Sequence, residues 1–91
     1  MIFVWDKTKS IANQRKHGIS FEEAETVFSD ASARLISDPD HSEDEDRFVL
    51  LGMSSKLNIL TVIHVYKDGE EIIRIISARK ATKNEQKKYK R

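Results

Sequence analysis

The chain has 91 residues, of which 38% are hydrophobic and 34% charged, with a formal net charge of +1 and no cysteine. This length suits one domain over residues 1–91, and the absence of cysteine excludes disulfides, thiolate catalysis and cysteine-ligated zinc. No apolar run approaches the roughly 20 residues that span a membrane, so we expect a small cytoplasmic protein.

The chain opens with a predicted strand and helix. The first residues lack the pattern of a secretory signal, and the apolar run at 2–5 is typical of a strand covered on both faces. Asp6 can cap a helix over residues 7–17, and Gly18 supplies the left-handed residue that commonly ends a helix. One face of this helix is predicted to carry Ile11, Ala12 and Arg15.

A second helix is predicted from residue 21 to about residue 29. Ser20 and Glu23 form a capping box, in which the serine hydroxyl accepts from the Glu23 N–H and the glutamate accepts from the Ser20 N–H. Because only three residues separate the two predicted helices, we expect them to form a short helical hairpin.

The rest of the chain is mainly β-type. Strands are predicted over 33–37, 47–53, 58–66 and 71–78, with an acidic loop over 38–46. Short turns join these strands, including Asp68-Gly69, so they should form an antiparallel meander. A capping box from Thr82 to Glu85 opens a basic terminal helix that ends near Lys90. The element order predicts an α+β fold, with helices packed on one face of the sheet.

The nearly neutral total hides a segregation of charge along the chain. Residues 1–19 have a net charge of +3, residues 20–46 a net charge of −9, and residues 47–91 a net charge of +7. If the two basic segments fold onto one face, they form a surface for a polyanion. The alternative is a set of solvated faces that keep a small protein soluble.

Motifs along nearly the whole chain resemble the BrnT family. They are Phe3-x-Trp5-Asp6, Asn13-x-x-Lys16-His17-Gly18-Ile19-Ser20-Phe21-Glu22-x-Ala24, Val27-Phe28, Arg47, Gly52, Arg74-Ile75-Ile76-Ser77-Ala78-Arg79-x-Ala81, and Glu85 with Tyr89. The resemblance implies a RelE-like fold, with two N-terminal helices packed on an antiparallel sheet and a C-terminal helix.

The same resemblance implies a function. It is that of a bacterial type II toxin, a ribonuclease that blocks translation as part of a stress response. The expected partner is a BrnA antitoxin with a ribbon-helix-helix domain, and their complex represses its own operon. Contact with operator DNA would therefore be indirect, through the antitoxin.

Metal-free cleavage of RNA needs a base for the 2′-OH, cations for the phosphorane and an acid for the 5′-oxygen. The candidate cations are Arg47, Arg74 and Arg79, since guanidinium suits bidentate phosphate contact. An odd separation puts Arg74 and Arg79 on opposite faces of a regular strand, unless Arg79 lies beyond the strand end. Arg47 follows four acidic residues, so a local ion pair is its alternative role.

Each of the other candidates has a structural alternative. His17 can act as the general acid or cap its helix, and Glu85 can act as the base or only complete its capping box. Lys16 and Tyr89 are candidate RNA contacts, although Tyr89 can instead dock the last helix. We expect no metal or other cofactor, which would make the protein a metal-independent endoribonuclease.

Two histidines and two rival functions complete the sequence interpretation. His64 is expected to be in the core or half-buried. His41 is expected in a solvated loop, since the acidic residues around it lack the glycine of an EF-hand. The first rival function is a non-catalytic module that binds nucleic acid or antitoxin as a co-repressor. The second is a protein-interaction domain that uses the acidic loop and exposed strand edges.

Overall fold

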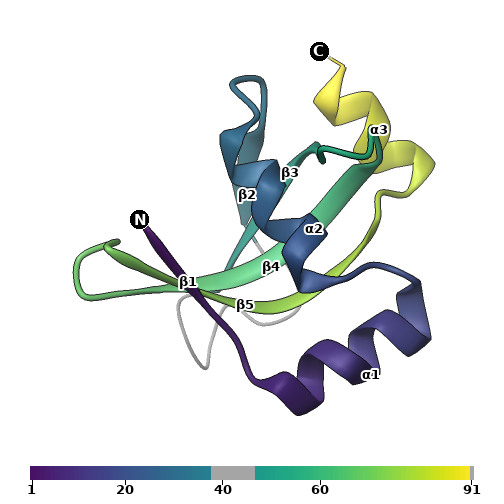
Figure 1. Cartoon of the computed structure of the whole chain (residues 1–91). Coiled ribbons are helices and arrows are strands. Elements are labelled where there is room, and N and C mark those ends of the chain that lie inside the picture. Colours follow the sequence, from purple (N-terminus) through teal and green to yellow (C-terminus); the bar gives the residue numbers. More distant parts are fainter. Residues whose placement is uncertain (38–46, 91) are drawn as a thin grey trace.

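The computed structural model describes residues 1–37 and 47–90, which form a sheet with helices packed against it (Figure 1). In chain order the elements are β1 (Ile2–Val4), α1 (Lys7–His17), α2 (Phe21–Thr26), the 3₁₀ turn η1 (Val27–Ser29), β2 (Arg34–Ser37), β3 (Arg47–Met53), β4 (Ile59–Lys67), β5 (Ile72–Lys80) and α3 (Lys83–Tyr89). The predicted elements are therefore confirmed, with small shifts at their ends. The acidic loop and His41 lie outside the described residues.

The five strands form one sheet in the order β1-β5-β4-β3-β2. Strands β2 to β5 pair antiparallel in succession, so the predicted meander is confirmed. Strand β1 lies at the opposite edge of the sheet from β2 and pairs parallel with β5. The turn signals in the sequence did not predict this pairing.

The expectation that the first strand is covered on both faces is wrong. Strand β1 forms an edge of the sheet, where Ile2 is 57% exposed and Val4 is 37% exposed. Only Phe3 turns inward, where it packs edge-to-face on Phe28. Successive side chains of a strand point to opposite faces, and only one face of this strand is covered by helices.

The predicted caps of the first two helices are largely confirmed. Asp6 accepts a hydrogen bond from the Lys9 N–H at 3.0 Å, and Gly18 has the left-handed φ of 72°. The Ser20 hydroxyl accepts from the Glu23 N–H at 3.0 Å. The prediction that the Glu23 carboxylate accepts from the Ser20 N–H is wrong. This buried carboxylate instead accepts from the Ser54 hydroxyl at 2.6 Å and from the Asn58 amide at 2.9 Å.

Helix α1 packs on the sheet through a polar residue rather than through the face that carries Ile11. Ile11 is 47% exposed, whereas Asn13 is the buried residue of the helix. Its side-chain amide donates to the Ile19 and Ala78 carbonyls and accepts from the Ala78 N–H. Asn13 therefore takes the place of a neighbouring strand at the part of β5 that β1 does not reach.

The core lies between the sheet and the segment that contains Ile19, α2 and η1. Alternate residues of a strand point to the same side of the sheet. Strands β3, β4 and β5 contribute apolar side chains to the core from one such side, which we call the helix face. The buried cluster consists of Ile19, Phe21, Ala24, Val27, Leu50, Leu60, Val62, Ile75 and Ala78. Among the described residues, no helix is long and apolar enough to cross a membrane.

Candidate nucleic-acid interface on the sheet

Two of the predicted arginines lie in one row across the sheet. Arg47 on β3 is opposite Val65 on β4, and Val65 is opposite Arg74 on β5. Residues directly opposite each other on neighbouring strands share a face, so both guanidiniums are on the face turned away from the core. With strands spaced about 4.8 Å apart, their Cα atoms are about 10 Å apart.

A β-bulge brings Arg79 to the same face. Ser77 is opposite Ile63 and Ile75 is opposite His64, so Ile76 is an extra residue in β5. One extra residue reverses the alternation of side chains beyond it. Arg79 is therefore opposite Thr61, which is four residues from Val65 and on the same face of β4. Arg74 and Arg79 lie on one face although they are five positions apart and both are inside the strand.

The register adds a fourth arginine that the sequence interpretation did not single out. Arg34 on β2 is opposite Leu51, which is opposite Thr61, so Arg34 ends the row that begins at Arg79. Only the strand pairing reveals this position. We call the surface that carries Arg34, Arg47, Arg74 and Arg79 the arginine face.

A row of three apolar residues and one serine runs between the two rows of arginines. It consists of Ile36, Val49, Ile63 and Ser77, which the pairing places side by side across β2 to β5. Val49 is only 4% exposed, and Ile36 and Ile63 are half-buried. The arginine face therefore combines cations at its margins with an apolar centre.

The four arginines differ in their surroundings. Arg34 and Arg47 already make interactions within the chain. Arg74 is half-buried, and within residues 1–37 and 47–90 its side chain has no hydrogen bond or ion pair. Arg79 forms the ion pair described next.

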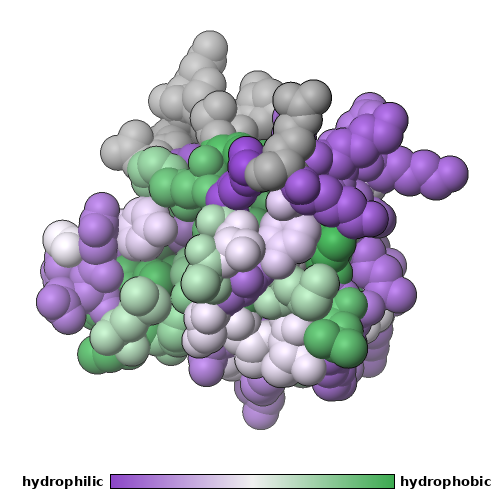
Figure 2. Space-filling view, turned by 90° about the horizontal axis from the view of Figure 1, so that it is seen from above, coloured by the Kyte–Doolittle hydropathy of each residue, from purple (hydrophilic) through white to green (hydrophobic). Residues whose placement is uncertain are grey.

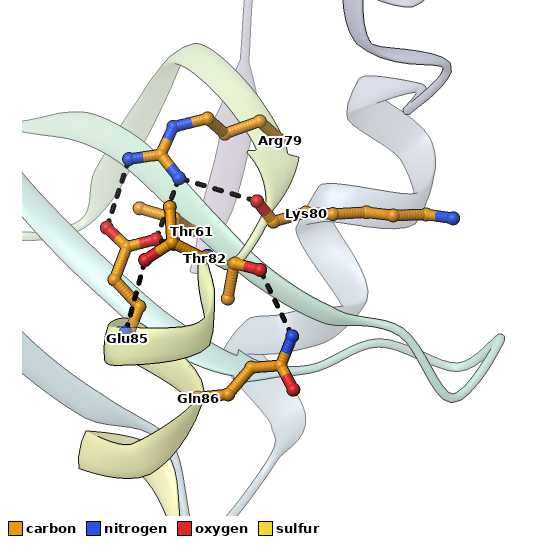
Figure 3. Close-up of polar contacts among 7 residues, drawn as sticks. Thr61, Arg79, Lys80, Thr82, Glu85 and Gln86 are labelled. Atoms are coloured by element: carbon orange, nitrogen blue, oxygen red, sulfur yellow. Dashed lines mark hydrogen bonds and ion pairs between the residues drawn. The ribbon is translucent and has the colours of Figure 1, made fainter.

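Arg79 and Glu85 form a two-point ion pair between β5 and α3 (Figure 3). Nη1 donates to Oε1 at 2.7 Å and Nη2 donates to Oε2 at 3.0 Å. The Arg79 guanidinium, with smaller contributions from the Thr82 N–H and the Thr61 hydroxyl, lowers the pKa of Glu85 from 4.5 to about 2. The same hydrogen bonds raise the pKa of Arg79. A carboxylate of such low pKa accepts a proton poorly, so this geometry suits an anchor for Arg79 better than a base.

The ion pair leaves one edge of the guanidinium available. Arginine has five N–H donors. In Arg79, Nη1 and Nη2 each donate to Glu85, and Nη1 also donates to the Lys80 carbonyl. The Nε–H and the second N–H of Nη2 have no partner among the described residues. These two donors lie side by side in a plane, the arrangement that matches two oxygens of a phosphate.

Helix α3 is held in place by its predicted capping box. The Thr82 hydroxyl accepts from the Glu85 N–H at 3.2 Å, and the Glu85 carboxylate accepts from the Thr82 N–H at 2.8 Å. Thr61, which is directly opposite Arg79, donates its hydroxyl to the same carboxylate at 2.9 Å. The capping residue therefore also fixes the position of the arginine.

The remaining predicted site residues lie elsewhere. Lys16 and His17 end α1, which packs against β5, and within the described residues neither is bonded to the four arginines or to Glu85. The Tyr89 hydroxyl donates to the Asp30 carboxylate at 2.7 Å and so docks α3. The Met53 N–H and then Tyr89 lower the pKa of Asp30, while Asp30 raises the pKa of Tyr89.

Within residues 1–37 and 47–90, no cluster of metal ligands marks the arginine face. A cleft of about 350 Å³ opens beside Asp30 and Tyr89, and none of the four arginines lines it. In the described part of the chain, no group of three or more histidine and acidic side chains is arranged to hold a metal ion. His64 is fully buried, as predicted.

Comparisons with known proteins agree with this fold. A family model described as the ribonuclease toxin BrnT of type II toxin–antitoxin systems matches residues 5–85. No curated protein sequence matches the chain. The 1.1 Å crystal structure of the Brucella abortus ribonuclease toxin BrnT is similar, with 28% sequence identity and a TM-score of 0.67 over 91% of this chain and 100% of that one. This similarity confirms the mixed α+β fold with a mostly antiparallel sheet.

Proposed function

The chain belongs to the BrnT family of ribonuclease toxins of type II toxin–antitoxin systems, and from this premise we propose that it cleaves RNA on the arginine face. Cleavage of RNA would inhibit translation, and a BrnA-type ribbon-helix-helix antitoxin would neutralise the toxin. The complex would contact operator DNA through the antitoxin.

One observation carries the proposal for the site. The register of the sheet and the bulge at Ile76 bring Arg47, Arg74 and Arg79 to one face from two strands. In the cleavage step the 2′-oxygen bonds to phosphorus, its proton passes to solvent, and the bond from phosphorus to the 5′-oxygen breaks. Preorganised guanidiniums stabilise the negative charge that develops on the phosphate. In the proposal, Arg74 and the open edge of Arg79 hold the phosphate, and Arg47 binds along the same path.

Glu85 then acts as a positioning residue. Its carboxylate binds two nitrogens of Arg79, and it is fixed by Thr61 and Thr82. In this role it holds the guanidinium edge toward the substrate, in place of the general base expected from the sequence. His17 is the candidate general acid of the proposal, and for that role the RNA has to reach from the arginine face to the end of α1.

Substitution of Arg74 tests the proposal most directly. Because this side chain has no polar partner within the described residues, Arg74→Gln should fold normally and lower the rate of RNA cleavage about 100-fold or more. The matched control is Arg15→Gln, which removes an exposed arginine from α1. Cleavage by purified protein is measured on labelled RNA, with and without EDTA, and we expect EDTA to change nothing. Equal rates for Arg74→Gln and wild type would contradict the proposed site.

A non-catalytic role is the second candidate. The observation that favours it is the ion pair of Glu85, because this carboxylate, the general base expected from the sequence, is already bonded to Arg79. A wild-type protein that binds RNA or antitoxin but leaves RNA intact would support a co-repressor. Expression without the antitoxin separates the two, since only a ribonuclease should arrest growth with breakdown of RNA.

A further inference from the structure

Helix α3 has a side that faces the body of the protein. Glu85 and Tyr89 are four residues apart and therefore lie on one side of the helix. Glu85 bonds Arg79 and Thr61, and Tyr89 bonds Asp30. These contacts fix which side of α3 is turned outward.

The outward side is made of lysines. Lys83, Lys87 and Lys90 follow one another at spacings of four and three residues, so they line up along the helix, and Lys88 is beside them. All four are exposed, and none has a side-chain hydrogen bond or ion pair among the described residues. Figure 2 is viewed from the side of the molecule on which α3 lies, and hydrophilic residues project there.

Helix stability does not explain this pattern. Lysines near a helix C-terminus complement the helix dipole, but Lys83 is in the first turn, where a positive charge is unfavourable. Like charges three or four residues apart also repel each other. The one acidic residue of α3, Glu85, is turned inward and paired with Arg79, so nothing on the helix offsets these charges.

We infer that the lysine side of α3 binds the phosphate backbone of RNA and extends the path of the substrate beyond Arg79. The inference rests on the proposed function, because it takes RNA as the ligand. The ion pair with Glu85 joins α3 directly to Arg79, so the lysines lie on the element next to Arg79. A strand held at Arg79 has to pass around one helix, about 10 Å across, to reach them. Lysines position a backbone without reading its sequence, so this contact would add affinity and no sequence preference.

The composition of this side favours a nucleic acid over a protein. Protein interfaces are depleted in lysine and depend on aromatic, methionine or arginine anchors at their centre. The aromatic residue of α3, Tyr89, is half-buried and already bonded to Asp30. An outward side with lysines and no apolar anchor matches a phosphate backbone, whose binding depends on neutralised charges.

The test compares two variants that each lose three lysines. One carries Lys83→Gln, Lys87→Gln and Lys90→Gln, and the control carries Lys7→Gln, Lys9→Gln and Lys56→Gln, which are exposed elsewhere. Binding is measured as a function of salt concentration with a 2′-O-methyl RNA of about 20 nucleotides. The methyl group prevents the 2′-oxygen from attacking the phosphate, so the RNA stays intact. Each lost contact with a single strand lowers the log–log salt slope by about 0.7, so the α3 variant should lose about 2 in slope and bind roughly tenfold more weakly.

The outcomes separate the inference from the proposed function. The role of α3 would be overturned if the log–log salt slope fell equally in both variants. It would also be overturned if the slope stayed unchanged in both. Normal RNA binding with weakened antitoxin binding would also overturn it, in favour of a protein-binding surface. Cleavage of ordinary RNA by the wild type is assayed separately, so its absence would refute the ribonuclease but not the RNA-binding role of α3.

Discussion

At the scale of single residues, buried polar side chains carry much of the specificity of this fold. Asn13 uses its amide to bond both backbone groups of Ala78, so it satisfies a strand edge and attaches α1 in one step. A buried backbone group without a partner costs about 1–3 kcal/mol, so this side chain has no apolar substitute. That explains an asparagine as the buried residue of an otherwise exposed helix.

His64 is another polar residue in the interior. Its ring lies edge-on to Phe28 and Tyr66 at centroid distances of 4.9 and 5.0 Å, and its Nδ1 is 3.2 Å from the Val62 carbonyl. Within the described residues its Nε2 has no hydrogen-bond partner. Burial lowers the pKa of His64 below its usual value of 6.5, so the interior holds the neutral ring.

The stability of the protein should therefore fall in mild acid. The unfolded chain takes up a proton on His64 near pH 6.5 while the folded protein does not, so stability is full above that pH and declines below it. The slope for one group is at most about 1.4 kcal/mol per pH unit. Urea unfolding between pH 7.5 and pH 5 measures it, and His64→Leu should flatten the curve. An unchanged slope in that variant would assign the effect to other groups.

At the scale of elements, β5 and α3 behave as one unit. Arg79 near the end of the strand and Glu85 in the helix are joined by two hydrogen bonds, and Thr61 of β4 and the cap residue Thr82 bond the same carboxylate. The contribution of this ion pair to stability is present above about pH 4.5 and is lost as pH falls toward 2.

Two substitutions of Glu85 distinguish positioning from base catalysis. Glu85→Gln keeps an oxygen that can accept from Arg79 and Thr82, so it should retain most cleavage, whereas Glu85→Ala should lose about tenfold or more. Glu85→Ala should also lower the free energy of unfolding by about 2 kcal/mol, since it removes a helix cap and a partly buried ion pair. A general base would instead be lost equally in both variants, together with one limb of the pH–rate profile.

At the scale of the whole molecule, the sheet separates two surfaces. The helix face packs on α2 and η1, and the arginine face carries the four cations around an apolar centre. Neighbouring residues of one strand point to different surfaces. On β2, Leu35 belongs to the helix face and Ile36 to the arginine face.

This separation predicts where RNA can be cross-linked. A photoreactive benzoylphenylalanine at Ile36 should cross-link to bound RNA, whereas the same residue at Leu35, which is 51% exposed, should cross-link little. The pair is matched because both positions lie on the same edge strand. Stronger cross-linking at Leu35 would place the RNA on the other side of the sheet and contradict the proposed site.

Local sequence signals were sufficient to predict the elements and the approximate positions of their ends. Helix caps act through hydrogen bonds or backbone preferences within a few residues, so the sequence alone predicts them. The caps predicted in this way are Asp6, Gly18, Ser20 and Thr82. The meander followed from short turns between β-type runs. The family motifs also identified arginines that the fold then brings to one face.

How these elements combine depends on contacts that form only in the folded protein. Whether Arg74 and Arg79 share a face depends on the bulge at Ile76, which arises from pairing with β4 and not from the spacing of the arginines. The place of Arg34 depends on a register across three strand pairs. The need for glycine at position 52 also depends on tertiary packing. A Cβ at Gly52 would come within 2.8 Å of Val27 and 2.9 Å of Ala33. Contacts between residues far apart in the chain have no signal in a local pattern, because they depend on which surfaces pack together.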